Sequence, residues 1–404
     1  MLQNRNSVLN SELDRKISHC AQTLRERAPA VDKEATIPSE NFELLGQNDM
    51  LILSAPENCG GYDIGFGGNG RKEKVEILER IASACSNTAQ CLNTHLSALG
   101  TISLLGDEKQ IERFANEIIE RNTIFSYYGS EPDQEFDTEE GDRIKYDTIV
   151  ERNGDEWIID GEKFFATNSL YADYHLVFAM EEDATDMSDL RVAIVPDDAD
   201  GIAIHDSWDG MGQRATASGR VEFNSVRIPD DNVIGEPGAL IESGIGGFGF
   251  QLDFAAHFVG IADGALRFTK RWLDEEAKPP SDLDSLSEDP HVQLRIGDMD
   301  IQVNAARELV REAARQLDAA ESEKEMKTAG TAVYRSKVFA SEVVVDISSR
   351  LFQITGARST SKMYNSDRFW RDGRTLVLHD IIDKQKTKVA RDVLGLESPT
   401  MSTR

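Results

Sequence analysis

The chain has 404 residues, of which 72 are Asp or Glu and 44 are Lys or Arg, so its formal net charge is −28. With 40% hydrophobic residues it is too apolar for an acidic disordered chain, and its length suits two or three domains with substantial cores. The negative surplus repels phosphate backbones and anionic lipids, which argues against nucleic-acid binding and against attachment to a membrane.

Residues 1–122 are predicted to form a helical domain. Segments such as Lys74–Ala84 and Lys109–Ile119 repeat apolar residues every three or four positions, the spacing of an amphipathic helix. The chain begins with neither the basic nor the apolar region of a secretion signal, and no run of about 18 apolar residues occurs in it, so we expect a cytoplasmic protein. The 4 cysteines show no metal-site spacing and are expected to be reduced.

Residues 123–236 are predicted to form a β domain, and residues 237–404 a second helical domain. Between Thr123 and Val195 short β-rich runs are separated by Gly, Asn and Asp, as in a small antiparallel barrel or sandwich. Beyond Gly238 the helical period returns, with an apolar stripe from Val303 to Leu317. The expected fold class is α+β, with helices and strands in separate domains and no internal repeat.

Common nucleotide-binding and hydrolase motifs are absent or out of context. Gly65–Gly70 and Gly244–Gly249 fit G-x-G-x-x-G, but a dinucleotide site needs a strand before and a helix after it, and strands and helices do not alternate here. The 7 histidines include no HxxxH or HExxH pair, and neither a G-x-S-x-G elbow nor a P-loop occurs. Zinc hydrolases, serine hydrolases and P-loop NTPases are therefore excluded, and no metal is expected.

What remains is an ordered set of short, uncommon motifs. The motifs are Gly129–Pro132, Gly161–Asn168, Trp208–Gly219, Gln353–Ser361 and Arg368–Asp380. Together they resemble the acyl-CoA dehydrogenase superfamily of flavoproteins, from about Leu44 to Gly395. The resemblance implies an N-terminal helical domain, a middle antiparallel β domain and a C-terminal four-helix bundle. It also implies a flavin between the β domain and the bundle, completed by a neighbouring subunit of a homodimer or homotetramer.

The sequence departs from a dehydrogenase at the catalytic base. A dehydrogenase of this family needs a carboxylate for proton abstraction. Counting from Arg371-Asp-Gly-Arg places Asp380 where many members have this Glu, one methylene shorter, and a misplacement of about 1 Å can cost roughly a hundredfold. In other members the base is a Glu just before an Arg on the first bundle helix, and these two positions match Phe250 and Gln251, so this second possible base is absent.

The nucleotide-binding motifs of the family are also altered. Acidic Asp133–Asp137 replaces the segment that contacts CoA, and the loop Glu275–Pro290 lacks the family's Arg for the ADP end of FAD. The glycine-rich pyrophosphate cradle is replaced by Gly356–Thr360. These losses favour FMN as the flavin, with FAD possible. The acidity of the same segments adds to a surplus that also suits a halophilic source; an ordinary acidic cytosolic protein is the alternative.

The departures resemble the reduced-flavin-dependent monooxygenase branch of the superfamily, which includes dibenzothiophene monooxygenase. There a reductase supplies reduced flavin, which reacts with O₂, and a pair of histidines is thought to steady the product of that reaction. The resemblance implies catalytic roles for His95 and His379, with Asp380 a third candidate. Flavin contacts are implied for Ser130, Thr167, Trp208, Gly356, Arg358 and Ser359.

Each of these residues also has a structural interpretation. His95 could be a satisfied core histidine, Asp380 could cap the helix that follows, and Arg358 could form a surface salt bridge. Ser130 and Thr167 could be turn hydroxyls, and Trp208 could be core.

Three functions compete on the sequence. The first is a flavin-dependent oxidoreductase acting as the oxygenase of a two-component monooxygenase, with a flavin reductase as partner and a small organic molecule as substrate. The second is an FAD-dependent acyl-CoA dehydrogenase with Asp380 as base and an electron-transfer flavoprotein as partner. The third is a non-catalytic oligomeric scaffold.

Overall fold

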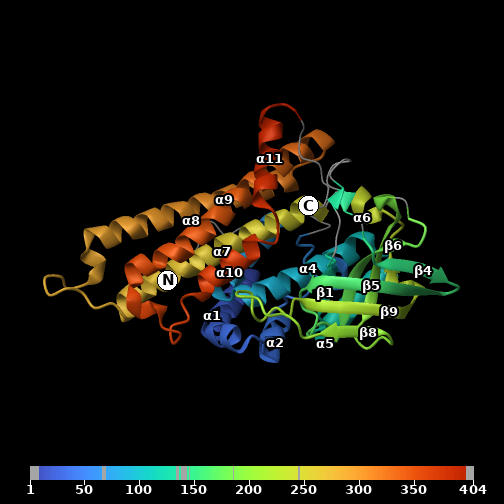
Figure 1. Cartoon of the computed structure of the whole chain (residues 1–404), viewed down its shortest axis with the longest axis horizontal. Coiled ribbons are helices and arrows are strands. Elements are labelled where there is room, and N and C mark those ends of the chain that lie inside the picture. The colour runs from blue at the N-terminus through green and yellow to red at the C-terminus, as the bar shows by residue number, and fades with distance from the viewer. Residues whose placement is uncertain are drawn as a thin grey trace.

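The computed structural model describes residues 9–65, 70–132, 136–137, 143–144, 146–184, 186–243 and 246–396. Figure 1 shows three long helices, α7, α8 and α9, running side by side, with the sheet at one end of them. The helices are α1 (Ser11–Glu34), α2 (Ser39–Gln47), α3 (Arg71–Ala84), α4 (Ser86–Leu105), α5 (Glu108–Arg121), α6 (Ala239–Glu242), α7 (Gly246–Glu275), α8 (Pro290–Asp318), α9 (Glu323–Thr355), α10 (Arg368–Val377) and α11 (Ile382–Val393). The strands are β1 (Phe125–Tyr128), β2 (Phe136–Asp137), β3 (Arg143–Ile144), β4 (Ile149–Asn153), β5 (Glu156–Ala166), β6 (Tyr174–Glu181), β7 (Leu190–Pro196), β8 (Ile202–His205), β9 (Gly219–Pro229) and β10 (Val233–Ile234).

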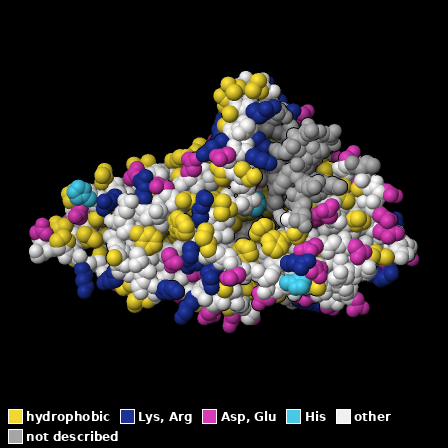
Figure 2. Space-filling view, viewed as in Figure 1, with side chains coloured by type: hydrophobic (Ala, Val, Ile, Leu, Met, Phe, Trp, Pro, Cys, Tyr) yellow, Lys and Arg dark blue, Asp and Glu magenta, His cyan; other side chains and the backbone are white. Residues whose placement is uncertain are grey.

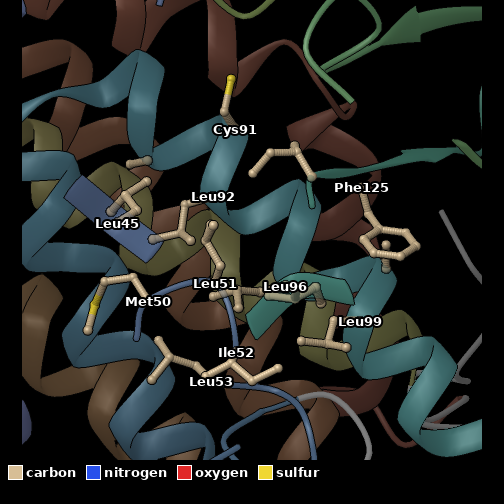
Figure 3. Packing of buried hydrophobic residues seen from close by; sticks show 14 of the residues in the cluster. Leu45, Met50, Leu51, Ile52, Leu53, Cys91, Leu92, Leu96, Leu99 and Phe125 are labelled. Atoms are coloured by element: carbon tan, nitrogen blue, oxygen red, sulfur yellow. The ribbon is translucent and has the colours of Figure 1, made fainter. Parts of the chain in front are cut away.

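Two of the N-terminal helices, α1 and α5, begin at a side-chain cap and bury one apolar face. Asn10 caps α1 by accepting from the backbone N–H groups of Glu12 and Leu13, and Asp107 forms a capping box with Gln110 at the start of α5. Helix α4 differs, since most of its own residues are small or apolar and it is buried on nearly all sides. Figure 3 shows its side chains packed against the segment Met50–Leu53 and against Phe125 of β1.

The main sheet has the strand order β10-β7-β6-β4-β5-β9-β8, with β1 also paired to β6. Most neighbours are antiparallel, as expected, but β1 and β4 both run parallel to β6. Strand β1 pairs with Tyr174–Val177 and β4 with Met180 and Glu181, so the two occupy successive halves of the same edge of β6. The chain leaves this edge after Tyr128 and returns to it at Ile149. The sheet is therefore mixed and not purely antiparallel. The alternating sequence pattern does not distinguish these two kinds of sheet.

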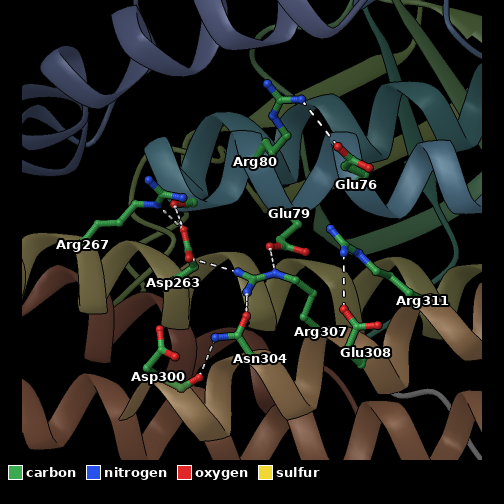
Figure 4. Close-up of polar contacts among 11 residues, drawn as sticks. Glu76, Glu79, Arg80, Asp263, Arg267, Asp300, Asn304, Arg307, Glu308 and Arg311 are labelled. Carbon is green, nitrogen blue, oxygen red and sulfur yellow. Dashed lines mark hydrogen bonds and ion pairs between the residues drawn. The ribbon is translucent and has the colours of Figure 1, made fainter. Parts of the chain in front are cut away.

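The C-terminal helices share one apolar core, and α3 of the N-terminal region joins it. Val75 and Leu78 of α3 lie in the same buried cluster as residues of α7, α8 and α9. A polar network beside this core connects the same elements (Figure 4): Arg307 of α8 donates to Glu79 of α3 at 2.6 Å and to Asp263 of α7 at 3.0 Å. The α+β class and the order helical, β, helical are confirmed.

The predicted divisions at 122/123 and 236/237 fall between α5 and β1 and between β10 and α6. Gly67 and Gly244 of the two glycine-rich stretches lie outside the described residues, as does most of Asp133–Asp142. Within the described ranges no helix is long and apolar enough to cross a membrane, and no group of three His, Cys, Asp or Glu residues could hold a metal ion.

Candidate active site

A cavity of about 510 Å³ lies where the sheet, α4, α7 and α10 meet. Hydrophobic side chains also gather on the surface near this junction of bundle and sheet (Figure 2). The edge of β6 helps to form the cavity, because Phe178 lies between the part of β6 paired with β1 and the part paired with β4. The aromatic residues of the wall are Tyr127, Tyr146, Phe165, Phe178, Trp208, Phe250 and Phe254.

No Asp, Glu, Lys or Arg is among the described residues that line the cavity. Its polar groups are hydroxyls, amides and one imidazole. Three of them have a buried polar atom with no hydrogen-bond partner in the described part of the chain: Gln90 Oε1, Gln213 Oε1 and Thr375 Oγ1. Flat aromatic walls and such orphaned atoms fit a planar, uncharged ring with donors and acceptors along its edge, which describes an isoalloxazine. The described wall offers no cation for a flavin phosphate.

His379 lies on the cavity wall just beyond the end of α10. Its ring stacks on Phe254 of α7, with centroids 3.9 Å apart and planes inclined by 23°, and Phe250 lies 5.6 Å away. Phe254 is buried, so α7 fixes the plane of the imidazole. The imidazole therefore faces the cavity from an apolar, ordered support.

Asp380, the next residue, does not line the cavity. Its carboxylate accepts from Lys337 Nζ of α9 at 3.0 Å, from the side-chain amide of Gln385 and from the backbone N–H of Ile381 at 2.7 Å. Burial raises the pKa of Asp380, but the charge and hydrogen bond of Lys337 outweigh it and hold the pKa below its ordinary value. The carboxylate is thus committed to an ion pair inside the bundle.

His95 of α4 is buried, and it is not among the lining residues. Its Nδ1 accepts from the backbone N–H of Phe125 at 3.0 Å, so Nε2 carries the hydrogen and donates to the carbonyl of Leu51 at 2.7 Å. Burial lowers the pKa of His95 to about 4. Both ring nitrogens are occupied, and the neutral ring connects α4 to β1 and to the loop before α3.

Ser130 and Thr167 both line the cavity, at the ends of β1 and β5. The backbone N–H of Phe164 donates to the carbonyl of Ser130 at 2.9 Å. Beneath them Lys163 and Glu131 form a buried ion pair of 2.6 Å, in which burial lowers the pKa of Lys163 to about 8 against the opposing charge of Glu131. This pair holds the two cavity segments together.

Trp208 lines the cavity near the start of the loop between β8 and β9. Its indole N–H donates to the carbonyl of Gln213 at 2.7 Å. Gln213 has a positive φ of 53°, and its own N–H donates to Asp372 of α10 at 2.7 Å. Burial, followed by the charge of Asp32, raises the pKa of Asp372 to about 7.

Gln213, Thr216 and Ser218 also line the cavity, although the sequence did not single them out. They lie inside the motif Trp208–Gly219, and two hydroxyls two positions apart beside a strand were the signal that could have identified them.

Gly356, Arg358 and Ser359 lie elsewhere, at the end of α9. Arg358 pairs with Glu276 at 2.7 Å and stacks over Trp272, and its side chain is 42% exposed. Ser359 is buried and hydrogen-bonds within the turn, to Thr355 and to the carbonyl of Gly356. None of the three lines the cavity of its own chain.

Comparison with known proteins gives concordant matches. Family models described as the acyl-CoA dehydrogenase N-terminal, middle and C-terminal domains match residues 15–122, 126–226 and 252–384. Dibenzothiophene monooxygenase of Mycolicibacterium goodii is 29% identical over 384 residues, covering 91% of this chain and 90% of that protein. The probable FMNH2-dependent monooxygenase SfnC of Pseudomonas putida is 29% identical over 393 residues, covering 95% and 93%. FMN-bound TdsC from Paenibacillus sp. A11-2 superposes with a TM-score of 0.88 at 24% identity, covering 97% and 99%.

Proposed function

This chain belongs to the acyl-CoA dehydrogenase family, and from that membership we propose that it is the oxygenase component of a two-component, reduced-flavin-dependent monooxygenase acting on a small organic substrate. It is a flavin-dependent oxidoreductase, as its relatives are. FMN is the favoured cofactor, because one relative is named as FMNH2-dependent and a structural neighbour holds FMN. FAD is the alternative.

The observation that carries the proposal is the pairing of His379 on the cavity wall with the absence of any carboxylate among the described lining residues. Desaturation requires a carboxylate within hydrogen-bond reach of the substrate proton. Asp380 is instead engaged by Lys337, and the residue at the other base position is Phe250, an apolar ring on the cavity wall. An imidazole in an apolar wall suits hydrogen bonding to a reactive group kept away from water.

The residues of the wall would divide the work as follows. When bound, reduced flavin supplies the electrons that activate O₂. Trp208, Phe250 and Phe254 would enclose the flavin ring and exclude water, while Gln90, Thr167 and Thr375 would meet polar atoms at its edge. His379 would hold a proton beside the reacting oxygen. His95 would act at one remove, by positioning β1 against α4.

Partners follow from the same proposal. A flavin reductase would supply the reduced cofactor, and a homo-oligomer, a tetramer by the family resemblance, would complete each site. In such an assembly Gly356, Arg358 and Ser359 would serve the flavin phosphate of a neighbouring copy, since they lie outside the cavity of their own chain. We also propose a halophilic source on the net charge of −28.

Rapid mixing with oxygen tests the proposal. The purified protein is loaded anaerobically with reduced FMN and mixed with O₂, while absorbance is followed. We expect a transient spectrum that differs from those of free reduced and free oxidised FMN, and reoxidation slower than that of free FMN. Reoxidation at the rate of free FMN, with no transient, contradicts the proposal.

Two alternatives have their own decisive measurements. If the protein were an acyl-CoA dehydrogenase that uses Asp380, at least one acyl-CoA in a panel of chain lengths would bleach the bound flavin under anaerobic conditions. We expect no bleaching.

If the protein were a non-catalytic scaffold, it would bind neither flavin at micromolar concentration in high salt. We expect FMN to bind.

A further inference from the structure

Three hydroxyl side chains form a continuous row along the cavity wall. Thr167 Oγ1 lies 2.9 Å from Ser218 Oγ, and Ser218 Oγ lies 2.7 Å from Thr216 Oγ1. Thr216 Oγ1 lies in turn 2.9 Å from the carbonyl oxygen of Gln213. Strand pairing creates the row, because Ala166 of β5 is opposite Gly219 of β9, so the residues just beyond, Thr167 and Ser218, meet.

The direction of the hydrogen bonds in this row is fixed by its last member. A carbonyl oxygen accepts only, so Thr216 donates its single hydrogen to Gln213. Ser218 must then donate to Thr216, and Thr167 must donate to Ser218. Reversal would leave two acceptor oxygens, those of Thr216 and Gln213, 2.9 Å apart with no hydrogen between them.

The Gln213 carbonyl that ends the row is itself held in place. It also accepts from the Trp208 indole at 2.7 Å, while the Gln213 N–H is held by Asp372 and its side-chain amide lies within hydrogen-bond distance of Ser86. The acceptor at the end of the row therefore cannot turn away without breaking contacts to Trp208, α4 and α10.

We propose that Ser218 and Thr216 are positioning residues that fix Thr167 as a hydrogen-bond acceptor toward the cavity, and that the site thereby selects the reduced over the oxidised flavin. The inference rests on the proposed function. Thr167 lines the cavity, and the family resemblance implies that it contacts the flavin, so the proposal places N5 of the flavin at this hydroxyl. On reduction, N5 of a flavin changes from an acceptor to an N–H donor, and a threonine that has already given its hydrogen to Ser218 can accept from that N–H. Oxidised flavin offers no hydrogen there, so a bond to its N5 would require the row to reverse.

The size of the preference follows from one hydrogen bond. Reversal of the row loses the bond from Thr216 to Gln213, and such a bond changes an equilibrium by roughly three- to tenfold. In a two-electron couple a tenfold change in the ratio of dissociation constants equals about 30 mV in midpoint potential. Either quantity reports the effect without any measurement of turnover.

The test compares the dissociation constants of oxidised FMN, in air, and of reduced FMN, under anaerobic conditions, across matched variants of the full chain. Ser218→Ala and Thr216→Val interrupt the row and free Thr167 to donate into the cavity. We expect each to lower the preference for reduced FMN by roughly three- to tenfold. Thr167→Val should lower it similarly, and Thr167→Ser, which keeps the hydroxyl, should restore it.

Ser169→Ala is the matched control. Ser169 is a buried serine beside the row that donates to the carbonyl of Ala217 at 2.7 Å and does not line the cavity. Its loss should shift both dissociation constants alike and leave their ratio unchanged. If Ser218→Ala still binds FMN and the ratio of its dissociation constants for oxidised and reduced FMN equals the wild-type ratio, this inference alone is overturned. Failure to bind FMN in either redox state overturns the proposed function and this inference with it.

Discussion

At the scale of single residues, His379 and Asp380 are neighbours in sequence with opposite environments. The imidazole faces the cavity from an aromatic support, and the carboxylate forms a buried ion pair with Lys337. A motif match assigned importance to both, but their different partners separate a residue that can touch a bound molecule from one that holds the bundle together.

Replacing His379 by Phe should preserve the stack on Phe254 while removing both ring nitrogens. We expect FMN affinity to change only a few-fold and product formation to fall by roughly a hundredfold or more, the usual effect of losing a positioned proton-transfer group. The check is reductase-coupled oxygen uptake against product yield once a substrate is found. Until then, the transient after oxygen mixing should decay faster in this variant, and His379→Gln should recover part of its lifetime.

Replacing Asp380 by Asn should affect folding before chemistry. The buried ammonium of Lys337 would lose the counter-charge that Asp380 gives it, at a cost of about 3 kcal/mol in unfolding free energy. Because the pKa of Asp380 is lowered on folding, its contribution is present above the ordinary pKa of about 4 and is lost as pH falls through the folded value. Denaturant titrations between about pH 3 and pH 7 should show the wild-type advantage shrinking at the acid end. A fully stable variant that no longer retains the oxygen transient would assign Asp380 to catalysis instead.

At the scale of elements, Arg307 connects three helices through two carboxylates, Glu79 and Asp263 (Figure 4). All three side chains are largely buried, and Arg307 compensates the charge of both carboxylates, although Asp263 also pairs with Arg267. The network joins the N-terminal helix α3 to the bundle, and the two regions should therefore unfold together rather than as separate units.

Arg307→Met tests this joint. Removal of the guanidinium takes from the buried Glu79 its ion pair with Arg307 and leaves Asp263 with Arg267, which should cost about 3 kcal/mol and lower the melting temperature. Arg315→Met is the matched control on the same helix, since its ion pair with Glu312 is exposed and should contribute little. Calorimetry should also show whether the single transition of the wild type splits in the Arg307 variant; equal melting temperatures for the two variants would contradict the role of the network.

The sequence predicted elements better than it predicted their contacts. Helical periods and β-rich runs located the three zones, and motif order led to Ser130, Thr167, Trp208 and His379, which all lie on one cavity. The sequence alone could not indicate that Lys337, 43 positions away, pairs with Asp380, because the two side chains meet only once α9 packs beside the end of α10. Nor could alternating patterns reveal that β1 and β4 run parallel to β6, since both arrangements bury alternate side chains.

At the scale of the whole molecule, the net charge of −28 acts against compactness. Figure 2 shows acidic and basic side chains interspersed on one face of the molecule. Salt shortens the reach of this repulsion, from about 10 Å at 0.1 M to about 3 Å at 1 M. The fold should thus gain stability from dissolved salt even where no ion binds at a specific place.

Thermal unfolding in KCl measures this gain. We expect the melting temperature to rise between about 0.1 M and 1 M salt, where surface repulsion is screened. The variant Asp282→Asn/Asp284→Asn/Glu288→Gln, in an exposed acidic loop, should show a smaller rise, and Ser281→Asn in the same loop should match the wild type. A rise that the triple variant leaves unchanged would locate the salt effect away from this loop, and no rise at all would contradict the halophilic proposal.

One edge of β6 pairs with β1 and then with β4, and the chain that connects these two strands contributes to the cavity wall. Because β1 and β4 pair with different halves of β6, their register does not depend on the length of the chain between Tyr128 and Ile149, in which Ser130 and Glu131 are fixed by their bonds to β5. That stretch includes Ser130 and Tyr146, which line the cavity together with Phe178 of β6. A lineage could therefore exchange substrates by exchanging this insert while inheriting the sheet unchanged, and the same stretch is the natural place for a designer to graft a new preference onto the scaffold.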